Sequence, residues 1–192
     1  MKEVGPPPID EWLAALRVEV VGASGAPGRE AISRDVVLDG ERRFDLRVTI
    51  AWVSGIGLSL WAYYGLEAME VPKRVLHRML RANFDYPFVK FAMTEDDRPM
   101  LVTELPAPAV TRDELARALV RLTVVADRLL EETASAVADR AVLPDWSERA
   151  PRNPELLAAH RAEIEGEMPV WQPPPAKGSR RTLLAWLRGG AR

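Results

Sequence analysis

Residues 43–52, Arg43-Phe44-Asp45-Leu46-Arg47-Val48-Thr49-Ile50-Ala51-Trp52, carry the pattern that decides the fold. Apolar side chains at the even positions alternate with charged or polar side chains at 43, 45, 47 and 49. In a strand this alternation places the two sets on opposite faces of a sheet, so one face is apolar and needs a cover. The preceding dipeptide Asp39-Gly40 favours a tight hairpin turn after a strand over residues 32–38.

The remaining pattern adds strands and helices around this strand. A third strand is expected over residues 57–64, and a second hairpin over 88–93 and 100–105. The sequence therefore predicts an α+β fold with an antiparallel five-stranded sheet, a three-strand meander plus a hairpin. Helices are expected over 8–17, after Pro72, and from a capping box at Thr111 and Glu114, where an apolar stripe continues to Leu130.

Composition divides the chain into a folded domain, residues 1–138, and a Pro-rich, partly helical tail, residues 139–192. Seven of the 16 prolines lie between Pro144 and Pro175, and their spacing forbids long regular elements. A short helix is expected to begin at Asn153-Pro154, with a thin apolar face. The basic segment Arg180–Arg192 ends the chain.

Charge and cysteine content exclude several classes of function. The 192 residues have a net charge of -2 and no cysteine, so we expect no nucleic-acid partner, disulfide framework or thiolate chemistry. No run approaches the roughly 18 apolar residues of a membrane span, and the N-terminus lacks the apolar stretch of a signal peptide. We therefore expect a cytoplasmic protein with no integral membrane segment.

Residues 20–28, Val-Val-Gly-Ala-Ser-Gly-Ala-Pro-Gly, are the strongest enzymatic signal, because their glycine spacing resembles a dinucleotide-binding loop. Too few residues separate this loop from the next strand for the helix that such a site requires, so a flexible loop is the better interpretation. Neither His77 nor His160 has a metal-binding spacing. We predict no enzymatic activity, cofactor or metal, and keep a dinucleotide-binding enzyme as a remote alternative.

Aromatic and basic side chains supply the candidate binding residues. Tryptophans in a Pro-rich segment resemble the anchors of binding surfaces, although a tail that packs back on its own domain explains them equally well. The candidate protein-binding residues are Trp61, Tyr63, Trp146, Trp171 and Trp186. The basic set Lys73, Arg74, Arg78 and Arg81 fits either the solvated face of a packed helix or a surface for an acidic partner.

The sequence from Val71 to about Glu132 resembles the YbjN-like bacterial family, described as sensory transduction regulators, with a type III secretion chaperone-like fold. The resemblance is carried by Leu80-Arg81-Ala82-Asn83, Pro87-Phe88-Val89-Lys90-Phe91-Ala92, Leu101-Val102-Thr103-Glu104-Leu105-Pro106 and Thr111-Arg112-Asp113-Glu114-Leu115. It implies a non-enzymatic protein-binding module, chaperone-like or a regulatory adaptor, that forms a homodimer and binds a protein segment. The alternative is an adaptor that docks on a membrane or an acidic partner through Arg180–Arg192, a peripheral contact.

Overall fold

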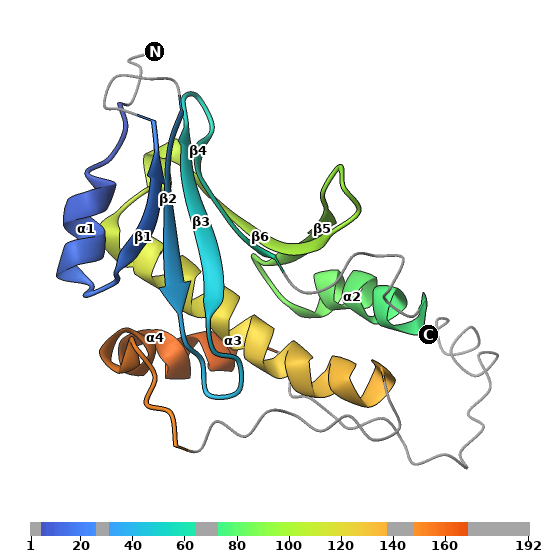
Figure 1. The fold of residues 1–192 in the computed structure, drawn as a ribbon. Helices are drawn as coiled ribbons and strands as arrows, with labels where there is room; N and C mark the ends of the chain where they lie inside the picture. Colours follow the sequence, from blue (N-terminus) through green and yellow to red (C-terminus); the bar gives the residue numbers. More distant parts are fainter. Residues whose placement is uncertain (1–4, 26–30, 64–72, 138–147, 169–192) are drawn as a thin grey trace, which may run out of the picture.

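The computed structural model of the chain describes residues 5–25, 31–63, 73–137 and 148–168. Within those residues a six-stranded antiparallel sheet curves around a long helix that crosses one of its faces (Figure 1). The fold is α+β, as the sequence predicts. The strands are β1 Val20–Ser24, β2 Ala31–Leu38, β3 Leu46–Val53, β4 Gly57–Tyr63, β5 Lys90–Met93 and β6 Pro99–Pro106, in the spatial order β1-β2-β3-β4-β6-β5.

The prediction of five strands is wrong, because residues that were expected to form a loop make the edge strand β1. β1 pairs antiparallel with β2, and Gly22 lies opposite Asp35. A Cβ atom at Gly22 would lie 2.9 Å from the Asp35 carboxylate, so the Asp35 side chain occupies the space that a larger residue at position 22 would need. The glycine that indicated a loop therefore lies within a paired strand, under the side chain of its partner residue.

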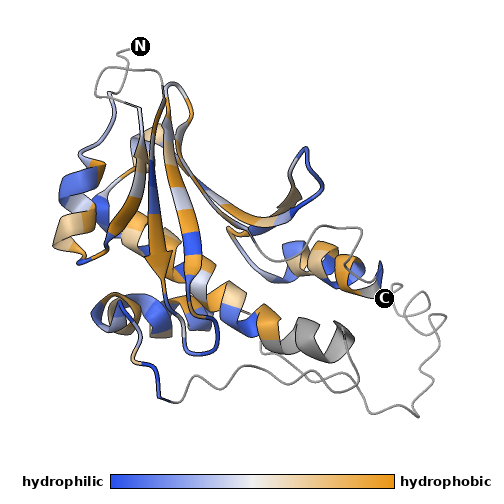
Figure 2. Cartoon of the chain, viewed as in Figure 1, coloured by the Kyte–Doolittle hydropathy of each residue, from blue (hydrophilic) through white to orange (hydrophobic). Residues whose placement is uncertain are grey.

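The apolar face of the sheet is covered by α1 (Ile9–Ala15), α2 (Lys73–Asp85) and α3 (Arg112–Val137). Its inward side chains come from every second position of β3, as the alternation predicts, and they are almost completely buried. α3 supplies the opposite wall of the core, and Figure 2 shows its largely apolar character. The central side chains are Leu46, Val48, Ile50, Trp52, Leu58, Leu60, Leu101, Leu115, Leu119, Leu122 and Leu129.

The loop between β2 and β3 is fastened by buried carboxylates instead of closing in the tight turn predicted at Asp39-Gly40. Asp127 of α3 accepts hydrogen bonds from the backbone N–H groups of residues 41, 42 and 43, at 2.8, 3.1 and 2.7 Å. A Cβ atom at Gly40 would lie 2.3 Å from that carboxylate, so glycine is needed for close approach. Asp39 is fully buried and accepts the backbone N–H of Asp45 at 2.8 Å.

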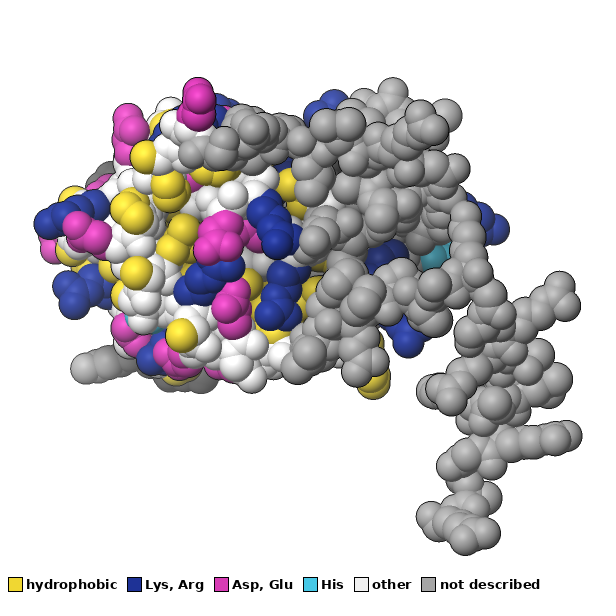
Figure 3. All heavy atoms as spheres, turned by 90° about the horizontal axis from the view of Figure 1, so that it is seen from below, with side chains coloured by type: hydrophobic (Ala, Val, Ile, Leu, Met, Phe, Trp, Pro, Cys, Tyr) yellow, Lys and Arg dark blue, Asp and Glu magenta, His cyan; other side chains and the backbone are white. Residues whose placement is uncertain are grey.

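The segment before α4 (Pro154–Glu167) lies against the same loop. Arg149 donates two hydrogen bonds of 2.7 Å to the Asp45 carboxylate, which Arg152 also contacts at 2.7 Å. The hydrogen bonds from Arg149 lower the pKa of Asp45 from 3.8 to about 2, and the bond from Arg152 adds to the effect. Figure 3 shows acidic and basic side chains side by side on the described part of the lower surface.

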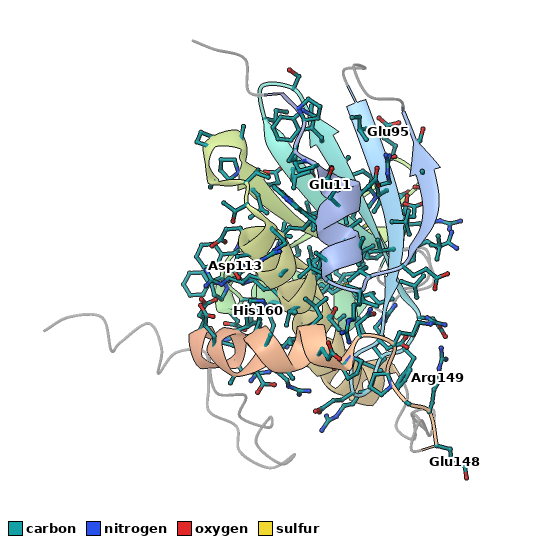
Figure 4. The ribbon with its side chains drawn as sticks, turned by 90° about the vertical axis from the view of Figure 1, so that its left-hand side faces the viewer. Glu11, Glu95, Asp113, Glu148, Arg149 and His160 are labelled. Carbon is teal, nitrogen blue, oxygen red and sulfur yellow. The ribbon has the colours of Figure 1, made fainter. Side chains whose placement is uncertain are left out.

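α4 packs on α3 with buried Leu156, Leu157, Ile164 and Met168. Three polar pairs follow the same order along both helices, Asp113–His160, Arg117–Glu163 and Arg121–Glu167, so the helices run parallel. The first pair is labelled in Figure 4. The alternative that the tail packs back on the domain therefore holds for α4, while the division at residues 138 and 139 stays a prediction.

Candidate functional site

α2 carries two apolar stripes, and the core takes only one of them. Val75, Met79, Ala82 and Tyr86 point into the core and are buried. At 100° per residue the opposite side of the helix carries Lys73, His77, Leu80, Arg81 and Phe84, which are all exposed. We call these five residues the outward face of α2.

The large apolar side chains on this face are exposed to solvent. Phe84 is 94% exposed and Leu80 is 66% exposed, and they lie one helical turn apart. Phe88, three residues after the helix ends, is 65% exposed. Exposed apolar side chains that lie close together mark binding surfaces more often than scattered ones do. We take the outward face of α2, together with Phe88 just beyond the end of the helix, as the candidate binding surface.

The basic side chains of the outward face have no ion-pair partner among the residues that the structure describes. Lys73, His77 and Arg81 make no ion pair or side-chain hydrogen bond within the described part of the chain. α1, α3 and α4 each carry an acidic residue in the first turn, which suits the helix dipole, whereas α2 carries none. In contrast, ion pairs engage Arg17, Arg34, Arg78, Arg98, Arg117, Arg121, Arg149, Arg152 and Arg161.

The candidate binding surface rests on a rigid support. The Asn83 side chain accepts the backbone N–H of Phe91 and donates to its carbonyl oxygen, so it occupies the free edge of β5 as a neighbouring strand would. Lys90 donates to the carbonyl oxygens of Asn83 and Tyr86 at the end of α2. These bonds fix α2 against the sheet and hold its outward face away from the core.

Phe88 is held at the border between α2 and α3. Its φ of 64° lies in the left-handed region, which is strained for a phenylalanine. The buried guanidinium of Arg121 lies 4.8 Å from the centre of its ring, in a cation–π contact, and donates to Glu167 at 2.9 Å. The Arg121 cation contacts the ring, and the ring stays 65% exposed at the surface.

Trp61 and Tyr63, two of the predicted binding residues, lie on the outer face of β4. The register places Trp61 between Thr49 and Val102, where it is half-buried, and Tyr63 is 49% exposed beside Met100. They lie on a different surface from α2, and their binding role stays a prediction. Trp146, Trp171, Trp186 and the segment Arg180–Arg192 fall outside the described residues.

The geometry of the glycine-rich stretch opposes a dinucleotide site. Gly22 lies within β1, which pairs directly with β2, and only six residues separate the two strands. A phosphate-binding loop has to open a helix, and this connection is too short to hold one. Asp39, the acidic residue after β2, could contact the ribose only from an open position, but it is buried and bonded to the loop backbone. The described residues also contain no group of three or more His, Cys, Asp or Glu side chains placed to hold a metal ion.

Sequence reasoning missed the outward face of α2. The helical pattern predicts one buried face of Val75, Leu76, Met79 and Leu80, but only Leu80 of these four is exposed, and Leu76 is half-buried against the core. Phe84, for which the sequence makes no prediction, is exposed as well. The available signal was the apolar pair Leu80 and Phe84, one turn apart on the side of the helix opposite Val75, Met79 and Ala82. A helix of 13 residues packed on one side cannot bury both stripes.

Comparisons with known proteins agree with the resemblance seen in the sequence. No curated protein and no solved structure matches the chain. None of the helices in the described part of the chain has the length and apolar character that a bilayer crossing requires. Residues 42–134, which include β3 to β6, α2 and most of α3, match the model of the YbjN family, described as "Putative bacterial sensory transduction regulator".

Proposed function

We propose that the chain is a non-enzymatic protein-binding module, a regulatory adaptor, that binds its partner through the outward face of α2 and Phe88. The observation that carries this proposal is the near-complete exposure of Phe84 beside the exposed Leu80 on a firmly held helix. Burying a phenylalanine contributes about 1.5–3 kcal/mol, so a partner that covers this ring gains a substantial part of its binding energy there.

The family match supports a regulatory role, because the YbjN description is that of a regulator and not of an enzyme. The matched residues contain α2 entire. An antiparallel sheet with helices on one face is also compatible with the chaperone-like fold that the resemblance implies. We extend the proposal to that fold, a cytoplasmic location and self-association as a homodimer, whose interface we leave unassigned.

The test compares full-length variants that change exposed apolar residues on two different surfaces. Phe84→Ser and Leu80→Ser should abolish the specific capture of a partner protein from the source cell, measured by quantitative mass spectrometry. Ile56→Ser is the matched control, because Ile56 is 56% exposed in the turn between β3 and β4. Thermal unfolding by circular dichroism should show all three variants folded, since none of the side chains is in the core.

Equal recovery of the same partner by wild type, Phe84→Ser and Leu80→Ser would refute the surface assignment. Loss of the partner with Trp61→Ser or Tyr63→Ser, and not with the α2 variants, would move the binding surface to the outer face of the sheet. Light scattering after size-exclusion chromatography on the same samples measures the oligomeric state.

A further inference from the structure

We infer that the partner segment that binds the outward face of α2 is an acidic amphipathic helix. This inference rests on the proposed function and adds the chemistry of the partner. Two properties of the face lead to it, namely basic side chains without a carboxylate partner in the described part of the chain, and a helical shape.

The charges of the face require an anionic partner. Lys73 and His77 occupy the N-terminal half, Leu80 and Phe84 occupy the C-terminal half, and Arg81 lies beside them. Lys73 and Arg81 lack carboxylate partners among the described residues, although ion pairs engage most other described arginines. Carboxylates from a partner would give Lys73 and Arg81 the kind of ion pair that most other described arginines make. A basic partner would bring like charges together.

The shape of the face favours a helix as the binding element. An α-helix of 13 residues is about 20 Å long, and its side chains at intervals of four form a ridge that fits the groove of a second helix. An extended strand has no place beside it, because Asn83 already occupies the backbone N–H and carbonyl of Phe91 on the neighbouring edge. Apolar side chains spaced along one side of the partner helix would cover Leu80 and Phe84.

A second copy and a membrane fit this face less well. Two copies of α2 packed antiparallel about a two-fold axis near Leu80 and Phe84 would place the Arg81 side chains of the two copies within about one turn of each other, which is repulsive. An anionic bilayer attracts each exposed cation, but the chain as a whole has a net charge of -2. An acidic helix contacts only the outward face of α2. It therefore avoids both the repulsion between two Arg81 side chains and the repulsion between an anionic bilayer and the net negative charge of the chain.

The test measures the binding of three labelled peptides to the full-length protein by fluorescence anisotropy. The peptides share one apolar helical stripe, and their remaining positions are Glu, Lys or Gln. In about 50 mM salt the Glu peptide should bind about tenfold more tightly than the Gln peptide, a difference of about 1.4 kcal/mol, and the Lys peptide should bind most weakly. The preference should fall at about 500 mM salt, because exposed charges are then screened.

Two variants separate the charge from the apolar contact. The double variant Lys73→Glu, Arg81→Glu should reverse the order of the Glu and Lys peptides. Phe84→Ser should weaken all three peptides by a similar factor of about ten, because it removes the shared apolar contact. The matched control is Arg112→Glu, since Arg112 is exposed at the start of α3, away from the face, and should leave the order unchanged.

Equal affinities for the Glu and Gln peptides, or an order that the double variant leaves unchanged, would overturn the inference. Binding to phosphatidylglycerol vesicles that Phe84→Ser abolishes, without a preference among peptides, would assign the face to a membrane instead. A halved mass of Phe84→Ser in light scattering would assign it to a second copy. If Phe84→Ser loses the cellular partner while the double variant retains it, the proposed function stands and only the acidic chemistry is wrong.

Discussion

Replacing Asp127 by asparagine should loosen the contact that fastens the β2–β3 loop to α3. The Asp127 carboxylate is buried and accepts three backbone N–H groups of the loop at 2.7 to 3.1 Å. Asparagine keeps the shape of the side chain, but its single oxygen can accept two of these donors at most. The third N–H then faces an NH₂ group, which is itself a donor.

The size of the effect follows from the bonds that change. A hydrogen bond to a charged group contributes about 1.5–3 kcal/mol, against about 1 kcal/mol for a neutral one. Asp127→Asn loses one charged bond and weakens two others, while water reaches part of the loop, so we expect a loss of about 2–3 kcal/mol. With a urea dependence of about 2 kcal/mol per molar, the unfolding midpoint should fall by about 1–1.5 M.

The assay is urea unfolding at pH 7, followed by far-ultraviolet circular dichroism. Asp97→Asn is the matched control, because Asp97 is exposed in the β5–β6 turn and has a φ of 57°, which asparagine tolerates well. The control should stay within about 0.5 kcal/mol of wild type. If Asp127→Asn has the same midpoint as Asp97→Asn, the buried carboxylate does not hold the loop and the reasoning fails.

Three further predictions concern an ion pair, the edge strand and α4. The pKa of Asp45 is lowered from 3.8 to about 2, so its ion pairs stabilise the fold above about pH 4, and this stability is lost as the pH falls through 2. Asp45 is half exposed, so Asp45→Asn should cost less than about 1 kcal/mol at pH 7, and urea titrations should show the difference from wild type shrinking between pH 4 and 2. Asn83→Ala should expose the edge of β5 and lower the hydrogen-exchange protection of the Phe91 amide roughly tenfold. An unchanged exchange rate of that amide would contradict the proposed role of Asn83. Ile164→Ala should cost about 2–4 kcal/mol in one cooperative transition, because Ile164 is fully buried between α4 and α3, whereas a separate transition for α4 would support a boundary at residue 138.

Local patterns were sufficient to predict the central elements of the fold. The alternation from Phe44 to Trp52 predicts β3, because in a strand it places all the apolar side chains on the same face, which is the face that packs on the core. The Thr111 cap predicts the start of α3, and its hydroxyl indeed accepts the N–H of Glu114 at 3.2 Å. Contacts across long sequence separations were not predictable in this way. Asp127 lies more than 80 residues from the loop that it holds, and nothing near it in the sequence indicates that loop.

Two apolar stripes on one short helix pose a choice that the sequence does not resolve. Val75 and Met79 are buried, and Leu80 and Phe84 are exposed, yet the two stripes have the same spacing and similar side chains. The packing of α2 decides between them. Asn83 bonds to β5, and Lys90 of β5 bonds to the end of the helix, so these contacts fix which side of α2 meets the core. Among the described residues, nothing covers Leu80 and Phe84, and no carboxylate pairs with Lys73 or Arg81 beside them. A helix that only closed the core would gain nothing from a phenylalanine on its solvent side, so the second stripe is better explained by a contact with another molecule.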